Sequence, residues 1–235
     1  MDNITEIIKA GIEFYETEDK QGITRYKSWD HCHKAFKEAK EKKKLEEHDI
    51  DYLCLQLSTY LASWGMFRNS FLLWCDYKVH EDVIKDVILN KEYSELWDIK
   101  IDNYNEYISK LSKLIKEIRD HYEPIREEVY KFLEKDVKND SGLTDTLISK
   151  ILLGTMACVP AYDRYFILAV RKLKITTGKF NPETIKKLVN NEIIKDILKG
   201  IPKKYSDNYP QMKLLDSCLW QYGYNLEKDK EADKE

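Results

Sequence analysis

The sequence is poor in glycine and proline, the two residues that most often interrupt helices. Its 235 residues include 8 glycines and 5 prolines, whereas charged residues, mainly lysine and glutamate, make up 34% of the chain. Lysine and glutamate are good helix formers. No stretch shows the apolar–polar alternation that is typical of a half-buried strand. We therefore expect an all-α fold, a globular multi-helix bundle of about ten helices with no sheet.

Long apolar runs and targeting segments are also lacking. The longest apolar run, residues 151–162, is shorter than the roughly 20 residues that a membrane-spanning helix needs. The N-terminus has no basic segment followed by an apolar run, so no signal peptide is indicated. We expect a cytoplasmic protein that does not contact a membrane.

The cysteines and histidines do not form a metal-binding pattern. The 5 cysteines are scattered without a Cys-x-x-Cys pair, and their apolar neighbours predict buried, reduced thiols. His31, Cys32 and His33 are too close in sequence to converge on one ion, because helical ligands would have to lie three or four positions apart. We expect neither a metal nor a cofactor.

Strong positive charge is absent as well. The formal net charge is −3, with 39 basic and 42 acidic residues. This balance argues against a general cationic coat for nucleic acid, but it leaves room for a local basic face.

Helical periodicity and helix-ending residues divide the chain into a series of amphipathic stretches. The expected helices cover residues 3–16, 29–44, 49 to about 74, 80–89, 101–122, 124–137, 144–155, 162–173, a pair between 182 and 200, and 207–226. The turn at residues 138–142 is the best candidate for a boundary. We expect an N-terminal sub-bundle of residues 1–139, a C-terminal sub-bundle of residues 140–226 that packs on it as one domain, and a charged tail at 227–235.

Several single residues set the expected helix boundaries. Ser28 and Asn181 are expected N-caps, and residues 17–24 an expected polar loop. Pro124 is expected to start a new helix, because a missing N–H group is harmless in the first turn. Gly65 is expected to permit the close approach of another backbone.

Three charged residues, Lys150, Asp163 and Arg164, stand in the longest weakly charged passage, residues 147–166. Lys150 precedes the apolar residues 151–153, and burial there would disfavour its charged form and make its amine a nucleophile. Asp163 comes near the start of a helix, where it could cap N–H groups or face a ligand. A short turn lies between the two, so their side chains could meet. The structural alternative is a solvent-exposed Lys150 and an Asp163 that is only a first-turn acid.

This order of residues resembles the catalytic region of the helix-hairpin-helix DNA glycosylases: a lysine on one helix, an apolar turn, then proline and an aspartate that starts the next helix. The resemblance covers about twenty residues. In that family the lysine attacks the sugar carbon of a flipped nucleotide, and the aspartate supports the developing charge. The resemblance implies Lys150 as the nucleophile and Asp163 as the acid, with Arg164 contacting a phosphate.

Two passages, residues 60–68 and 159–166, are also similar to passages of uncharacterised bacterial all-helical proteins. This second resemblance implies nothing about activity.

Trp64 and Arg68 are four positions apart on an expected helix and would share one face. The Arg68 guanidinium could then stack on the indole and present its planar fork to a carboxylate or phosphate. In the functional interpretation they form one wall of a pocket, and the turn between Lys150 and Arg164 forms the other. In the structural interpretation Arg68 belongs to a buried ion pair, for example with Asp163, that fixes helix packing.

Two classes of function remain open. As an enzyme or a binding protein, the chain would act on a nucleic-acid base or nucleotide through Lys150 and Asp163. The aromatic residues Trp64, Phe67, Tyr162 and Tyr165 would stack on the base. As a non-enzymatic module, it would bind a protein partner or a second copy of itself through its 16 tyrosines, since tyrosine is favoured at interfaces.

Overall fold

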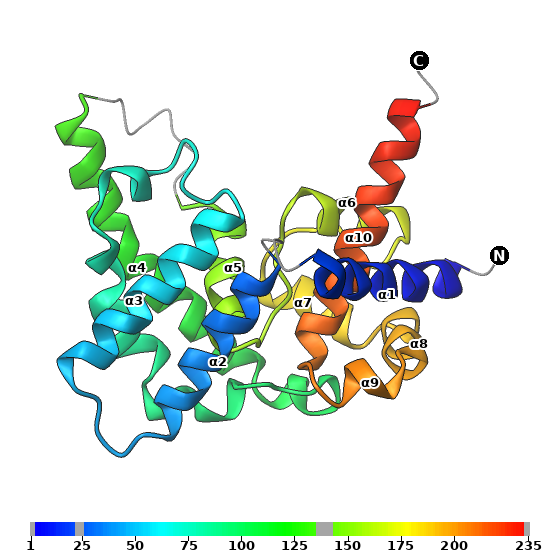
Figure 1. Ribbon diagram of the computed structural model, residues 1–235, viewed down its shortest axis with the longest axis horizontal. Coiled ribbons are helices and arrows are strands. Elements are labelled where there is room, and N and C mark those ends of the chain that lie inside the picture. Colours follow the sequence, from blue (N-terminus) through cyan, green and yellow to red (C-terminus); the bar gives the residue numbers. More distant parts are fainter. Residues whose placement is uncertain (1–2, 22–25, 135–142, 233–235) are drawn as a thin grey trace. The chain divides into compact units, whose positions relative to one another are not determined.

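The computed structural model describes residues 3–21, 26–134 and 143–232, and all the regular structure in these ranges is helical. The all-α fold expected from the sequence is therefore confirmed (Figure 1). Within the described ranges, no helix is both long enough and apolar enough to cross a membrane. The expected turn at residues 138–142 lies outside the described residues.

The chain forms two compact units, and each is assembled from separate stretches of sequence. Unit 1 comprises Met1–Thr24, Asp98–Ile108 and Ala157–Glu235, and unit 2 comprises Arg25–Trp97 and Ser109–Met156. This division differs from the expected one, which placed a single boundary near residue 140. The apolar turn at Ala157 is where the chain passes from unit 2 to unit 1 for the second time.

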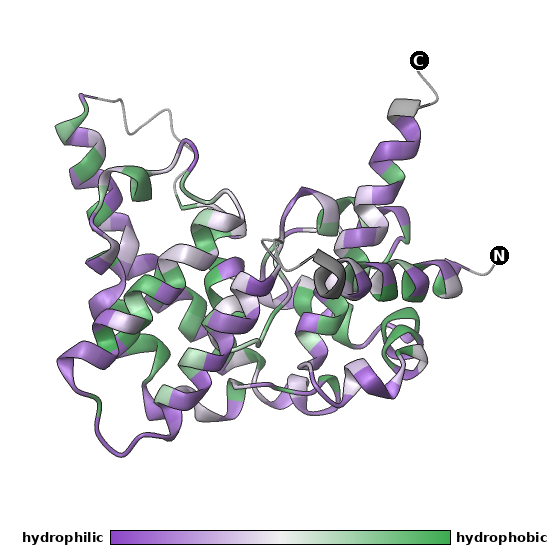
Figure 2. Ribbon diagram, viewed as in Figure 1, coloured by the Kyte–Doolittle hydropathy of each residue, from purple (hydrophilic) through white to green (hydrophobic). Residues whose placement is uncertain are grey.

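Unit 2 contains four long helices and a series of short ones. They are α2 (Lys27–Glu41), α3 (Glu47–Ser63), the short turns η1 (Phe71–Trp74), η2 (Tyr77–His80), η3 (Val83–Ile88) and η4 (Lys91–Leu96), α4 (Ile108–Phe132, its first residue in unit 1) and α5 (Asp145–Thr155). Helix α5 is buried from Leu147 to Thr155, as a helix that is apolar on most sides must be. The connection between α2 and α3, in contrast, is hydrophilic (Figure 2).

Specific contacts fix α5 against α2 and α3. The Trp29 indole donates to the Leu153 carbonyl at 2.9 Å, and His33 Nδ1 lies 2.9 Å from the Thr155 carbonyl oxygen. On the other side, Gly154 faces the ring of Tyr60 so closely that an added Cβ would lie 2.4 Å from Tyr60 Cε1. The absence of a side chain at residue 154 is what allows α3 and α5 to pack at this distance.

Unit 1 is arranged around the long C-terminal helix. Its elements are α1 (Asn3–Gln21), η5 (Ile101–Glu106), α6 (Arg164–Lys172), α7 (Pro182–Val189), α8 (Glu192–Gly200), α9 (Lys203–Ser206) and α10 (Gln211–Ala232). Helices α1 and α6 both pack on α10 (Figure 1). Phe14 meets Trp220 edge to face, with ring centroids 6.0 Å apart.

A buried, non-helical segment leads into α6. Its backbone groups are bonded by side chains instead of by a helix. The Tyr104 hydroxyl donates to the Cys158 carbonyl at 2.7 Å, and the Ala161 N–H donates to Asp216 at 2.9 Å. Lys213 and Asp216, on α10, are themselves buried. Buried backbone groups require such partners, so these side chains fix the path of the turn before Asp163.

Several expected helix boundaries were wrong. Helix α1 continues to Gln21, through most of the expected loop, because its charged residues are compatible with a solvated helix. Ser28 lies inside α2 and its hydroxyl bonds that of Ser63, so it is not an N-cap. Pro124 lies within the continuous helix α4. A proline there removes one hydrogen bond without ending the helix, because packing of the apolar face outweighs the loss.

Other local expectations are confirmed. Asn181 caps α7, with Pro182 as its first residue, and Thr144 precedes α5. All five cysteines lie in the described ranges and none forms a disulfide; four are buried as expected, but Cys75 is only partly buried. Burial raises the pKa of the Cys32 and Cys158 thiols well above the usual value. Such thiols stay protonated and are poor nucleophiles.

Candidate functional site

The first wall of the candidate site is the turn that follows α3. Met66 N–H bonds the Leu61 carbonyl at 2.9 Å and Gly65 N–H bonds the Ala62 carbonyl at 2.9 Å, the hydrogen-bond pattern of a Schellman motif. This motif requires a left-handed residue, and Gly65 supplies it with φ of 75°. Gly65 therefore ends the helix. No atom would lie within 4 Å of an added Cβ, so the expected close backbone approach at Gly65 was wrong.

The end of α3 changes the relation between Trp64 and Arg68. The expected helix to residue 74 stops at Ser63, so the two residues do not share a helical face. Asn69 adds a second left-handed residue, with φ of 58°, and Ser70 caps η1 by accepting the Leu72 N–H. The Arg68 side chain is exposed, not buried as an internal ion pair would require. These tight turns place Arg68, Asn69 and Ser70 on one short strap.

The opposite wall comes from α4 and the beginning of α5. Arg126 and Tyr130 lie on α4, and Thr144 caps α5 by accepting the Leu147 N–H at 3.2 Å. Arg119 holds this wall in place: its guanidinium donates to the Leu143 carbonyl at 2.9 Å and pairs with Asp145. The start of α5 is thus ordered by its own cap and tied to α4 by an arginine.

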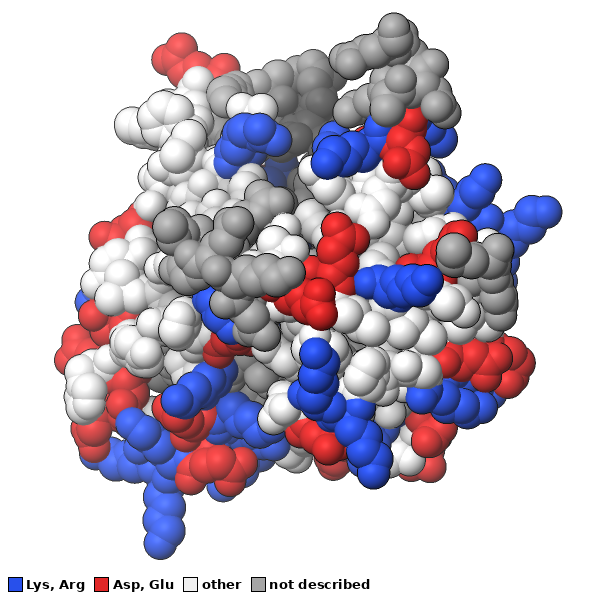
Figure 3. Space-filling model, turned by 45° about the vertical axis from the view of Figure 1, so that its right-hand side comes forward, with Lys and Arg blue, Asp and Glu red and all other residues white. Residues whose placement is uncertain are grey.

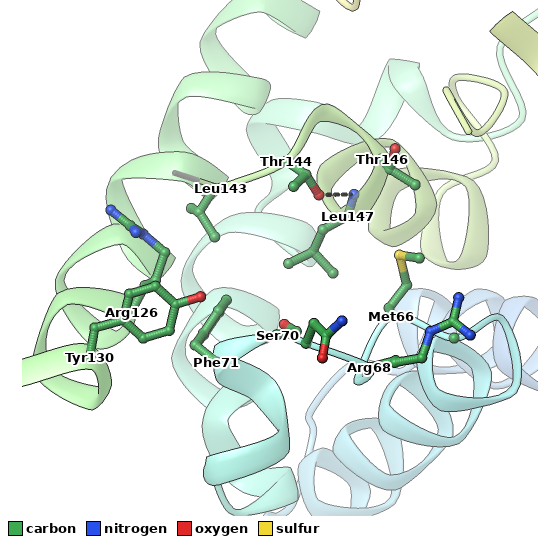
Figure 4. A pocket seen from close by; sticks show the side chains of 12 residues that line it. Met66, Arg68, Ser70, Phe71, Arg126, Tyr130, Leu143, Thr144, Thr146 and Leu147 are labelled. Carbon is green, nitrogen blue, oxygen red and sulfur yellow. Dashed lines mark hydrogen bonds between the residues drawn. The ribbon is translucent and has the colours of Figure 1, made fainter. Parts of the chain in front are cut away.

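Between the two walls lies a cavity of about 320 Å³ within unit 2. It is lined by Gly65, Met66, Arg68, Asn69, Ser70, Phe71, Arg126, Tyr130, Leu143, Thr144, Thr146 and Leu147. Figure 4 shows Arg68 and Arg126 on opposite sides, with Phe71, Leu143 and Leu147 between them. The cavity therefore has an apolar middle and a cationic group at each side.

The charged side chains that line this cavity have one sign. Among the residues that the structure describes, the lining includes two arginines and no aspartate or glutamate. Arg126 is only 4% exposed; it pairs with Glu123, one turn earlier on α4, and its guanidinium lies 5.3 Å from the Tyr130 ring centroid. Arg68 is at the exposed side. The hydroxyls of Ser70 and Thr144 accept backbone N–H groups, which leaves each hydroxyl hydrogen to be donated. Such a lining is suited to an anionic ligand.

Lys150 lies in unit 2 but is not among the residues that line this cavity. It is 3% exposed, so the expected burial is confirmed and the solvent-exposed alternative is wrong. Its Nζ lies 4.7 Å from the Trp64 ring centroid. The cation that stacks on Trp64 is therefore Lys150. The sequence had suggested Arg68 instead. A buried ammonium on an indole face is favoured electrostatically.

The remaining candidate residues belong to unit 1. Asp163 is the N-cap of α6, accepting the N–H groups of Tyr165 and Phe166 at 3.1 and 3.2 Å. The capping role weighed from the sequence is thus confirmed. Arg164 is exposed and pairs with Glu227 at 3.1 Å. The observed partner of Arg164 is a carboxylate, and the expected contact with a phosphate stays a prediction.

The two tyrosines of this group lie in different surroundings. Tyr162 is 1% exposed, and its ring packs against Phe166 and Phe180, with centroids 4.9 Å away in each case. Tyr165 is partly exposed and meets Trp220 edge to face at 5.3 Å. Tyr162 is therefore a core residue of unit 1, and Tyr165 is the more accessible ring.

The second wall of the Arg68 cavity differs from the expected one. The turn between Lys150 and Arg164 does not line it; its place is taken by α4 and residues 143–147. Sequence reasoning missed Arg126 and Tyr130. The signal was present: Arg126 falls on the apolar stripe of its helix, where a charged residue is rarely left without a partner or a purpose.

The chain has no match among protein-family models, curated proteins or solved structures. The site must therefore be interpreted from its own chemistry. Figure 3 shows basic and acidic side chains interspersed over the described residues of one face, without a broad area of positive charge there. Among the described residues, no group of three or more histidines, cysteines or acids could hold a metal ion.

Proposed function

We propose that unit 2 binds a nucleotide in the cavity between the Arg68 strap and the start of α5. The observation that carries this proposal is that the described lining of a cavity of about 320 Å³ contains two arginines and no acidic residue. That volume lies in the roughly 300–1,000 Å³ range of small-molecule sites. A nucleotide fits this chemistry, because it combines a planar ring with an anionic group.

The exposed Arg68 would hold the phosphate. A guanidinium binds phosphate through two parallel hydrogen bonds, and the hydroxyls of Ser70 and Thr144 can each donate one more. The base would occupy the apolar middle, against Leu147 and the partly exposed ring of Tyr130. Arg126 is already paired with Glu123, so it would contribute mainly positive potential and the support of Tyr130.

Calorimetric titration with nucleoside monophosphates, the matching nucleosides and inorganic phosphate tests this proposal. Arg68→Ala removes charge-assisted hydrogen bonds, of which a single one is worth about 1.5–3 kcal/mol, so nucleotide affinity should fall at least roughly 10- to 150-fold. The nucleotide affinity of Arg68→Lys should lie between those of Arg68→Ala and the unaltered chain. Lys116→Ala, a change of an exposed cation on α4, is the matched control and should leave affinity unchanged. Equal affinity for nucleosides and nucleotides would refute recognition of the phosphate.

Lys150 is the residue that would make the function enzymatic. Its amine is buried on the face of Trp64, and a lysine amine is the group that forms Schiff bases with carbonyl substrates. It would condense with the C1′ aldehyde of an abasic nucleotide, releasing water, and borohydride would reduce the resulting imine to a stable amine. A borohydride-trapped adduct that is lost in Lys150→Ala supports this chemistry. If no adduct forms with any lesion, the proposal that Lys150 is a nucleophile is rejected. Non-covalent nucleotide binding at Arg68 would stand.

A second candidate function is association of the chain with a second copy of itself. Unit 2 exposes several large apolar side chains: Tyr52, Leu55, Leu73, Trp74 and Phe132. Adjacent Leu73 and Trp74 are 59% and 57% exposed, and tryptophan is enriched at the centres of interfaces. Sedimentation velocity should show a concentration-dependent dimer that Trp74→Ser abolishes. A monomer at all concentrations would exclude this function.

A further inference from the structure

Three tyrosines of unit 1 line a second cavity, which is separate from the Arg68 site in unit 2. Tyr15 comes from α1, Tyr205 from α9, and Tyr209 from the turn before α10. Together with Lys204 and Asn208 they enclose about 240 Å³. The helix pattern of the sequence does not predict this cluster, because its first member is far from the others in the chain.

The rings form a small stack with one accessible member. Tyr15 lies parallel to Tyr205, with centroids 4.8 Å apart and an angle of 22° between the planes, and it lies 4.6 Å from the Tyr209 centroid. Tyr15 and Tyr205 are 2% and 6% exposed, whereas Tyr209 is partly exposed. The buried Tyr15 ring contacts Tyr209, and the Tyr209 N–H donates to the Tyr205 carbonyl at 3.0 Å. Tyr209 is thus held in position, so a planar ligand can extend the stack on it without a large entropic cost of ordering it.

The polar groups of this cavity favour an anionic ligand. Lys204 Nζ lies 4.5 Å from the Tyr205 ring centroid, and none of the described residues that line the cavity is acidic. A site for a quaternary ammonium would need aromatic faces without a competing cation, so that class of ligand is excluded. Asn208 donates its amide N–H to the Lys204 carbonyl at 2.8 Å. Its amide oxygen can therefore accept a hydrogen bond from a ring N–H.

The size of the cavity restricts the ligand further. About 240 Å³ is smaller than a typical site for a whole small molecule, which begins at roughly 300 Å³. The cavity suits one planar ring of a longer ligand that continues over the surface. A ring to stack on tyrosine, with an anion beside a lysine, is the repeating unit of a single-stranded nucleic acid.

We propose that this tyrosine cluster is a stacking site for one base of a single-stranded nucleic acid, with Lys204 beside the adjoining phosphate. Base stacking on an aromatic ring does not depend on the base, so the site binds without strong sequence preference. It does not require the Arg68 cavity to bind a nucleotide. The proposal assigns unit 1 a role of its own.

Fluorescence anisotropy with labelled oligo(dT) and oligo(rU), each roughly 12 nucleotides long, tests the proposal on the full-length protein. Tyr209→Ala should weaken binding roughly tenfold, the lower part of the effect typical for one stacked base. Tyr209→Trp should restore it, because the larger ring stacks as well or better. Lys204→Glu should weaken binding and reduce the dependence of log affinity on log salt by about 0.7 per lost phosphate contact.

Matched controls separate the site from general effects. Tyr52→Ala removes a tyrosine that is 51% exposed on α3, and Lys199→Glu reverses an exposed charge on α8. Both variants should bind the oligonucleotides like the unaltered chain. In the Arg68→Ala background, Tyr209→Ala should still weaken oligonucleotide binding to the same extent. If neither oligonucleotide binds, or if Tyr209→Ala and Lys204→Glu bind as well as the controls, the proposal is overturned. Preference between oligo(dT) and oligo(rU) tells whether the ligand is DNA or RNA.

Discussion

The close packing of α5 on α3 gives the sharpest prediction about stability. Gly154 is buried, and a Cβ on it would lie 2.4 and 2.6 Å from two ring carbons of Tyr60, which is itself 1% exposed. The ring cannot move aside, because its surroundings are packed at the density of a crystal. Overpacking of this kind costs about 1–3 kcal/mol, and alanine recovers up to about 1 kcal/mol of helix propensity. Gly154→Ala should therefore lower the free energy of unfolding by about 1–2 kcal/mol.

Denaturant unfolding followed by tryptophan fluorescence and circular dichroism measures this change. Gly65→Ala is the matched comparison, because Gly65 has φ of 75° and no atom within 4 Å of its added Cβ. It should also destabilise, by about 1–2 kcal/mol, but through backbone strain alone. Replacing Tyr60 with leucine removes the clashing ring atoms. A double-mutant cycle should then show coupling of about 0.5–3 kcal/mol with Gly154→Ala and almost none with Gly65→Ala.

The reasoning would be refuted by either of two results. A Gly154→Ala variant as stable as the unaltered chain would mean that α3 and α5 are not in the contact described. Equal coupling of Tyr60 to both glycine substitutions would mean that the loss arises from backbone effects.

Three further predictions concern single residues. Burial lowers the pKa of His80 from 6.5 to about 3, so between these values the unfolded chain binds a proton that the folded chain does not. The contribution of His80 to the free energy of unfolding should be constant above pH 6.5 and fall by up to about 5 kcal/mol towards pH 3. His80→Gln should flatten this part of the unfolding profile. Asp163→Ala should cost about 1 kcal/mol as a lost N-cap, whereas Asp163→Asn should retain most of the unfolding free energy. Pro124→Ala should raise the unfolding midpoint by restoring a hydrogen bond to the Asp120 carbonyl, a net gain of about 1–2 kcal/mol.

Local chemistry was predictable wherever the side chain itself makes the decisive contact. Asn181, followed by Pro182, carries the cap of α7 in its own side chain, and the structure confirms this prediction. Pro124 was misjudged because tertiary packing of the long apolar stripe of α4 overrides one missing hydrogen bond. Gly65 was misjudged because sequence alone does not tell a glycine that permits contact from one that supplies a left-handed φ.

The candidate site was predictable only in part, for a related reason. The burial of Lys150 follows from its apolar neighbours and is confirmed. Its partner Trp64 comes from the turn that follows α3, and no periodicity within a helix encodes that pairing. The Arg68 cavity depends likewise on Arg126 and on residues 143–147, which meet the strap only after the helices pack.

The interleaved course of the chain restricts how the protein can be dissected. Residues 98–108 belong to unit 1 but interrupt unit 2, and Ala157 begins the last part of unit 1. A fragment ended at residue 139 would lack α5, and with it the helix that fills the interior of unit 2. A nascent chain, likewise, cannot complete unit 2 before Met156 has left the ribosome. Deletion mapping will therefore report on misfolding, and point substitutions are the sound way to assign activities to either unit.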